Sequence, residues 1–198
     1  MATYRETIER VMSGDFADAT EEERNESIRN VIQVCSVAAG AVAIQPFPFV
    51  DVALITPIQI AMVQAIGRIH GHKLDRKSVV EILASFGASI VAQNVMLAAV
   101  KFVPFFGWIV GVSMAYALTW AIGEVADHYF RHGRGVPTSE LQDMFKRIYR
   151  DKRAEKEEEV TKDPTLKERL QQLNDAFESG LIDDDEFQAK KEQILAGH

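Results

Sequence analysis

Apolar residues recur with helical spacing through most of the chain, and no stretch shows the strict alternation of apolar and polar residues that marks a strand. Thr20 followed by Glu23 forms the pattern of a capping box, so a helix is expected to begin there and to run to the turn at Pro46–Pro48. Turns or polar segments separate three further expected helices, which cover about Asp51–Gly67, Ser78–Val100 and Trp108–Arg131.

These elements predict an all-α protein built around a four-helix bundle of two apolar helical hairpins. A charged connecting helix, capped by Ser139 and Gln142, is expected to dock along its first half only. Pro164 suits the first position of a C-terminal two-helix module. The expected domains are an acidic N-terminal segment (1–24), the apolar helical-hairpin domain (25–136), the charged connecting helix and linker (137–162) and the two-helix module (163–198).

The two hairpin turns are apolar and aromatic, which is unusual for segments that normally face water. Alternate turns of an up-down-up-down bundle lie at the same end, so the turns at 45–51 and 101–108 should share one end. The polar segment at 68–77 and everything after residue 137 should gather at the other end. The side chains expected to contact a membrane or a partner protein are Phe47, Phe49, Phe105, Phe106 and Trp108.

Small residues recur at every fourth position in two of the expected helices. Such faces let helix backbones approach closely, as helix pairs in lipid often do, although soluble bundles use them too. The residues expected to pack helices in this way are Gly107, Gly111, Ala115, Thr119, Gly123, Ala84, Ala88 and Ala92.

Charge follows the same lengthwise division. Residues 31–136 hold only twelve charged side chains, and both flanking segments are acidic. The stretch 102–122 has no charge and is long enough to cross a hydrocarbon core of about 30 Å. However, Gln33, Asp51 and Gln59 would be costly against lipid, and a fully spanning bundle should have polar turns on its far side. Two modes of membrane contact remain: hairpins inserted tip-first, or a bundle that rests its tips on the bilayer.

The net charge, the single cysteine and the N-terminal segment limit the possible partners and the cellular compartment of the protein. A net charge of −7 without a basic aromatic groove excludes nucleic acid as the main partner. Cys35 is the single cysteine, so no internal disulfide can form. The N-terminus has no apolar run after a basic start, and the protein is therefore expected on the cytoplasmic side.

Catalytic signatures are absent, so we expect neither an enzyme nor a cofactor. Glu124, His128 and His132 repeat at intervals of four on one helix, a spacing that a metal site could use. No supporting shell is visible, and a solvated helix end explains the three residues better. We therefore expect no metal, although a metal-binding sensor remains a weak third alternative.

Residues 31–132 resemble a bacterial family of unknown function, number 697 among such domains, which is often fused to Era-like GTPases. The matching positions include Pro46, Pro48, Asp51, Gly71 and the turn 104–107. The resemblance implies a membrane-associated helical domain without catalytic residues. Because this chain shows no GTPase domain, a GTPase partner could act only in trans.

The tail resembles the short C-terminal (SHOCT) domain, a two-helix module suspected of mediating oligomerisation. About thirty residues cannot bury a core alone, so the module needs another surface. The apolar residues expected to support homo-oligomerisation are Leu166, Leu170, Leu173, Phe177 and Phe187.

Together these observations predict a non-enzymatic, membrane-associated helical scaffold on the cytoplasmic side of the bacterial inner membrane. It would attach to lipid by its apolar hairpin tips and self-associate through its C-terminal module. The alternative is a soluble oligomeric interaction or adaptor module, with its tips buried against protein, that serves a GTPase in trans.

Overall fold

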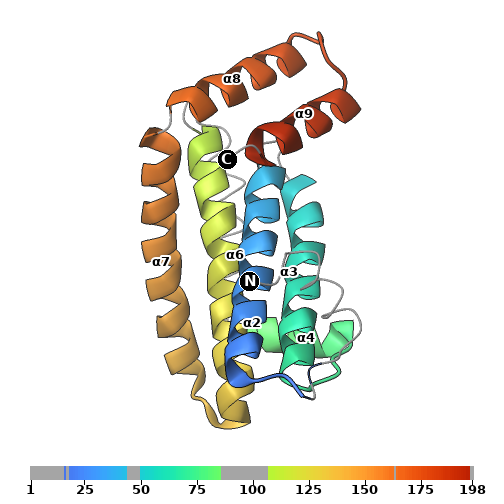
Figure 1. Ribbon diagram of the computed structural model, residues 1–198. Helices are drawn as coiled ribbons and strands as arrows, with labels where there is room; N and C mark the ends of the chain where they lie inside the picture. The colour runs from blue at the N-terminus through green and yellow to red at the C-terminus, as the bar shows by residue number, and fades with distance from the viewer. Residues whose placement is uncertain (1–15, 17, 44–49, 86–106, 163, 197–198) are drawn as a thin grey trace.

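The computed structural model describes residue 16 and residues 18–43, 50–85, 107–162 and 164–196, and the described residues form an all-α fold (Figure 1). The helices in chain order are α2 (Glu21–Val42), α3 (Val50–Ile69), α4 (Arg76–Ser85), α6 (Gly107–His132), a 3₁₀ turn η1 (Gly133–Gly135), α7 (Thr138–Lys162), α8 (Pro164–Glu178) and α9 (Asp184–Ala196).

Local sequence signals start α2 and α9 where expected, whereas α7 begins at Thr138, so Ser139 lies inside its first turn and is not the expected cap. Thr20 Oγ1 accepts a hydrogen bond from the backbone N–H of Glu23 (3.3 Å), and the Glu23 carboxylate accepts one from the N–H of Thr20 (2.9 Å). The expected capping box therefore opens α2. Asp183 and Glu186 form the same reciprocal pair before α9, at 2.8 and 3.3 Å.

The long helices α2, α3, α6 and α7 lie side by side and form the bundle (Figure 1). The charged helix α7, expected as a connecting helix, packs along α6 as well. Of the helix expected over Ser78–Val100 the structure describes only α4, which lies at the end of the bundle where α3 finishes. Residues 86–100 of the expected helix, with Ala88 and Ala92, lie outside the described residues.

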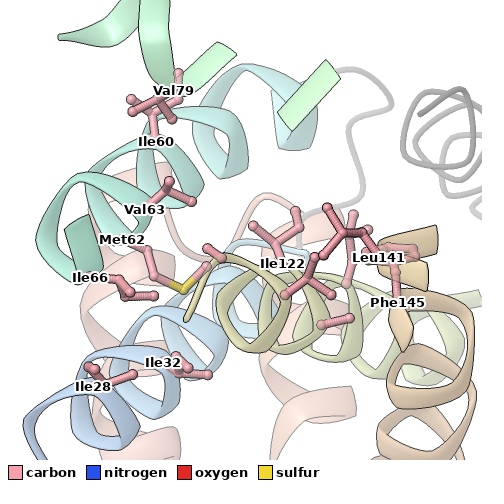
Figure 2. Packing of buried hydrophobic residues seen from close by; sticks show 14 of the residues in the cluster. Ile28, Ile32, Ile60, Met62, Val63, Ile66, Val79, Ile122, Leu141 and Phe145 are labelled. Atoms are coloured by element: carbon pink, nitrogen blue, oxygen red, sulfur yellow. The ribbon is translucent and has the colours of Figure 1, made fainter. Parts of the chain in front are cut away.

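One apolar core joins α2, α3, α4, α6 and α7. Figure 2 shows Ile28 and Ile32 of α2 and Met62 of α3 near Ile122 of α6, with Phe145 of α7 beyond it. Apolar side chains on three sides of α6 thus hold the bundle together, because their burial removes apolar surface from water.

The helix α7 packs along the whole of α6, which corrects the expectation that only its first half would dock (Figure 1). Leu141 and Phe145 of its first turns are buried, and so is Val160 near its end. Between them, Lys152 Nζ lies 4.6 Å from the ring centroid of Trp120, and Lys156 Nζ lies 5.1 Å from that of Tyr116. The lysine that comes later in α7 contacts the aromatic ring that comes earlier in α6. The two helices are therefore antiparallel.

The direction of α7 decides where the C-terminal module lies. The helix starts at the polar end, near the last turn of α6, and carries the chain back to the end where α2 finishes and α6 begins. The helices α8 and α9 lie across that end (Figure 1). The expectation that everything after residue 137 gathers at the polar end is therefore wrong.

Candidate functional site

The candidate site is the end of the bundle where α2 finishes and α3 and α6 begin, called here the apolar end. It comprises the last turn of α2, the first turns of α3 and α6, and the two helices that lie across them. Four of the five expected contact residues, Phe47, Phe49, Phe105 and Phe106, lie outside the described residues. The fifth, Trp108, is in the first turn of α6, where the structure describes the backbone only.

The helices that lead to this end are almost uncharged. Between residues 31 and 67 the one charged residue is Asp51. Val34 and Val37 of α2 and Leu54 of α3 are exposed to 37, 42 and 44%. These three partly exposed aliphatic side chains belong to the two helices that reach the apolar end.

The small-residue positions of α6 lie where this helix meets α2 and α3. Gly111, Ala115, Thr119 and Gly123 are all buried. A Cβ added to Gly123 would come within 2.6 Å of the Ile32 side chain, so only glycine allows this approach of α6 to α2.

The remaining small-residue positions are described less fully. Ala84 is in the last turns of α4 and Gly107 begins α6, and both are described by their backbone only. Whether these faces serve lipid or protein packing stays a prediction, since close approach occurs in both settings.

A buried polar contact joins α3 to the same region of α6. The Gln59 side-chain amide donates a hydrogen bond to Thr119 Oγ1 at 3.2 Å, and both residues are almost fully buried. Gln59 was one of the polar residues expected to be costly against lipid, and here it faces a neighbouring helix instead. The bundle can therefore keep this glutamine without exposing it to an apolar surrounding.

The C-terminal module covers part of the apolar end with a small apolar cluster of its own. Leu170 and Leu173 of α8 and Phe187 of α9 are buried with Val112, in the second turn of α6. The Phe177 and Phe187 rings lie 4.7 Å apart between the two module helices, and α9 also contacts α2. Sequence analysis did not single out Val112, because nothing distinguishes it from the other apolar residues of α6.

The residues expected to mediate oligomerisation thus have partners within one chain. Leu170, Leu173 and Phe187 are nearly or fully buried, and Phe177 is partly buried against them. Leu166 is in the first turn of α8, where the structure describes the backbone only. Their role in self-association stays a prediction.

The opposite, polar end is held by a charged network. Asp127 of α6 lies 2.7 Å from His70 Nε2 and 2.9 Å from Arg131 Nε. Arg131 in turn donates a hydrogen bond to the side chain of Asn25 on α2. Burial opposes ionisation of Asp127, but the hydrogen bonds from His70 and Arg131 outweigh it and lower the pKa of this carboxyl.

The expected candidates for a metal site are engaged in other contacts. Glu124 accepts a hydrogen bond from the Trp120 indole at 3.1 Å. His128 Nε2 lies 3.3 Å from a carboxylate oxygen of Glu140 on α7. Within the described ranges no group of three histidine, cysteine, aspartate or glutamate side chains could hold a metal ion.

Cys35 on α2 is partly buried, and burial raises the pKa of its thiol to about 11. The thiol is therefore protonated at neutral pH, which suits a packing residue better than a nucleophile. In the described part of the chain, no helix is both long enough and apolar enough to cross a membrane.

Comparison with known proteins adds two family matches and one relative. The family model described as "Domain of unknown function (DUF697)" matches residues 9–154, and the "Short C-terminal domain" (SHOCT) model matches residues 168–195. Both resemblances expected from the sequence are confirmed, and the first match extends through most of α7. "Magnetosome membrane protein 22" of Magnetospirillum gryphiswaldense is 27% identical over 115 residues, which cover 54% of this chain and 59% of that protein. No solved structure matches the chain.

Proposed function

We propose a membrane role for this chain, which belongs to the family described as domain of unknown function DUF697. It is a non-enzymatic helical scaffold, and it attaches to a membrane through its apolar end. The observation that carries the proposal is the nearly uncharged α2–α3 hairpin, which exposes Val34, Val37 and Leu54 and leads into an aromatic turn. The relative named magnetosome membrane protein 22 also supports membrane attachment.

Attachment would proceed from the cytoplasmic side of the bacterial inner membrane. Four basic residues, Lys73, Arg76, Lys77 and Arg131, are exposed at the polar end, opposite the apolar end. Cationic side chains stay on the cytoplasmic side when apolar hairpins enter a bilayer. Aromatic and aliphatic side chains at the tips would then lie among the lipid headgroups and the upper acyl chains.

Self-association through the C-terminal module is the second part of the proposal. Because the apolar residues of α8 and α9 are covered within one chain, two copies would associate by exchanging modules. A scaffold of this kind needs no catalytic group, and a GTPase partner would act on it in trans.

The test is fractionation of the full chain in bacterial cells, with membranes washed in high salt and then in alkaline carbonate. We expect the chain to resist both washes and the Phe105→Asp/Phe106→Asp variant to move to the soluble fraction. Charged side chains at the tips would oppose their burial in lipid, each by about 2–4 kcal/mol at full depth.

The matched control is Val80→Asp, which makes the same kind of change at an exposed position of α4, at the opposite end. This variant should stay with the membrane. Unchanged pelleting of the Phe105/Phe106 variant, with a circular dichroism spectrum like that of the parent, would exclude attachment through these tips.

A soluble adaptor is the second candidate function, and the position of α8–α9 favours it. A module that covers the apolar end within one chain gives that end a protein surface to pack against. Recovery of all the protein from the cytosol as a defined oligomer, without detergent, would support the adaptor against membrane attachment.

A further inference from the structure

The apolar end is the surface that the proposed function assigns to lipid, yet the same chain places two helices over it (Figure 1). Val112 of α6 is only 6% exposed, and its apolar neighbours in this cluster are Leu170, Leu173 and Phe187. A bilayer at the apolar end and the helices α8–α9 would therefore occupy the same end of the bundle, so the two contacts compete.

The module is joined to the bundle less firmly than the bundle is joined within itself. Its apolar cluster is separate from the core of the bundle, and among the described residues Val112 is the bundle's one fully buried contribution to it. The other buried members come from α8 and α9, which also contact each other through the Phe177 and Phe187 rings, tilted by 35°. The C-terminal module, α8 with α9, can thus move away from the bundle as a unit and leave most of the bundle core intact.

The connection between α7 and α8 allows such a movement. The helix α7 ends at Lys162, and α8 begins two residues later at Pro164. Proline has no backbone N–H to continue the preceding helix, and it disfavours helical geometry in the residue before it. The chain can therefore change direction here without unfolding either helix.

The module also contains polar groups that fit poorly in a permanently closed position. Gln188 Nε2 and Asn174 Oδ1 are buried with no hydrogen-bond partner in the described part of the chain. Such groups lower the stability of a packed arrangement.

We propose that α8–α9 is a displaceable cover: closed, it hides the apolar end of the bundle, and a lipid surface binds the form in which it has moved away. The inference rests on the proposed function, because it assigns a regulator to the same lipid-binding end. The partner that it names is an apolar lipid surface, which replaces the leucine and phenylalanine contacts of the cover.

Binding of the full-length protein to vesicles of phosphatidylethanolamine with a minority of phosphatidylglycerol tests the cover. The variant is Phe187→Asp, which places a charge in the cluster that holds the cover closed. We expect it to bind vesicles on the order of tenfold more tightly than the parent, since a mainly closed population reduces the apparent affinity by the open fraction. The matched control, Leu181→Asp, makes a similar change in the same module at a residue that is 78% exposed, and it should bind like the parent.

A second measurement uses the unmodified chain and does not depend on the folding of a variant. Amide hydrogen exchange in α8 and α9 should become faster when vesicles are added, whereas exchange in α6 should stay slow. If amide exchange in α8–α9 is unchanged or slower when the protein is bound to vesicles, the proposal that α8–α9 moves away is wrong.

The failures of the two proposals can be told apart. If Phe187→Asp binds no better than the parent while Phe105→Asp/Phe106→Asp loses binding, the cover is wrong and the membrane attachment stands. If neither the parent nor Phe187→Asp binds vesicles, the membrane attachment is wrong and the cover falls with it.

Discussion

At the scale of single residues, Asp127 ties together three helices at the polar end. Its carboxylate contacts His70, directly after α3, and Arg131, which reaches Asn25 on α2. The side chain of Asp127 is only 16% exposed and its contact with His70 is partly buried, so this contact is better shielded from water than a surface ion pair. One carboxylate therefore helps to align α2, α3 and α6.

Replacing Asp127 with Asn should lower the free energy of unfolding at neutral pH by on the order of 1–3 kcal/mol. The pKa of Asp127 is lowered in the folded state, so its contribution is present above the unfolded value of about 3.9 and is lost as the pH falls through the folded pKa. Urea unfolding should be measured from neutral pH to below about pH 4. The free energies of unfolding of the parent and the variant should become equal towards the acid end of this range.

The matched control for this prediction is Asp143→Asn. Asp143 is 79% exposed and lies 3.6 Å from Lys146, so its loss should change stability little at any pH. A constant difference between parent and Asp127→Asn across the acid range would contradict the assigned role of the carboxylate.

At the scale of elements, the contact between α2 and α6 depends on side chains that are small enough for the two backbones to come close. Gly123 faces Ile32, and Gly111 lies where an added Cβ would be 3.6 Å from the carbonyl oxygen of Ala43. Ala39, Ala43 and Ala115 form a small buried cluster with Ile55 in the same region. Volume added on this face must push the helices apart or force a side chain from its rotamer.

Gly123→Val should therefore destabilise the protein by about 1–3 kcal/mol, because the new side chain would overlap Ile32 in a filled core. The measurement is the urea midpoint at constant slope. Gly135→Ala is the control: an added Cβ there meets nothing within 4 Å, and its effect should stay within about 0.5 kcal/mol. Equal midpoints for Gly123→Val and the parent would show that α2 and α6 are not tightly packed here.

The pairing of α6 with α7 shows what sequence patterns miss at this scale. Lys152 and Lys156 look like residues of a solvated, charged helix, yet each covers an aromatic ring of α6. Lysine can bury its aliphatic stem while its ammonium group stays over a ring face. The four-residue spacing of Trp120 and Tyr116 matches that of the two lysines, and this match was the available signal.

At the scale of the whole molecule, the described residues form a large bundle core, a small cluster between α2, α3 and α6, and a C-terminal cluster to which the bundle contributes Val112. The bundle buries many apolar side chains around α6, whereas the module relies on a few, including Val112. A small cluster removes little apolar surface from water and so resists opening weakly.

Amide hydrogen exchange on the full chain in water should show this difference. The slowest amides are expected in the buried segment of α6 around Leu118 and Ile122, and those of α8 and α9 should exchange at least tenfold faster. Protection of α8–α9 equal to that of α6 would mean that module and bundle open together, and a displaceable cover would then be excluded.

Features that depend on neighbours along the chain could be predicted from the amino-acid sequence. The capping pairs Thr20–Glu23 and Asp183–Glu186, the bounds of α6 and the all-α class followed from local signals and from helical spacing. Helix starts depend on hydrogen bonds between residues three positions apart, so a sequence displays them directly. The motifs of both families are likewise local and could be identified without coordinates.

Which surfaces meet follows from the tertiary structure alone. The packing of α7 on α6 depends on lysines and aromatic rings far apart in sequence, and the contact of α8–α9 with Val112 depends on the length and direction of α7. Such contacts form between faces whose partners no local pattern names, because apolar burial is non-directional and rewards any surface of suitable shape. The apolar end was thus visible in the sequence, and its cover was not.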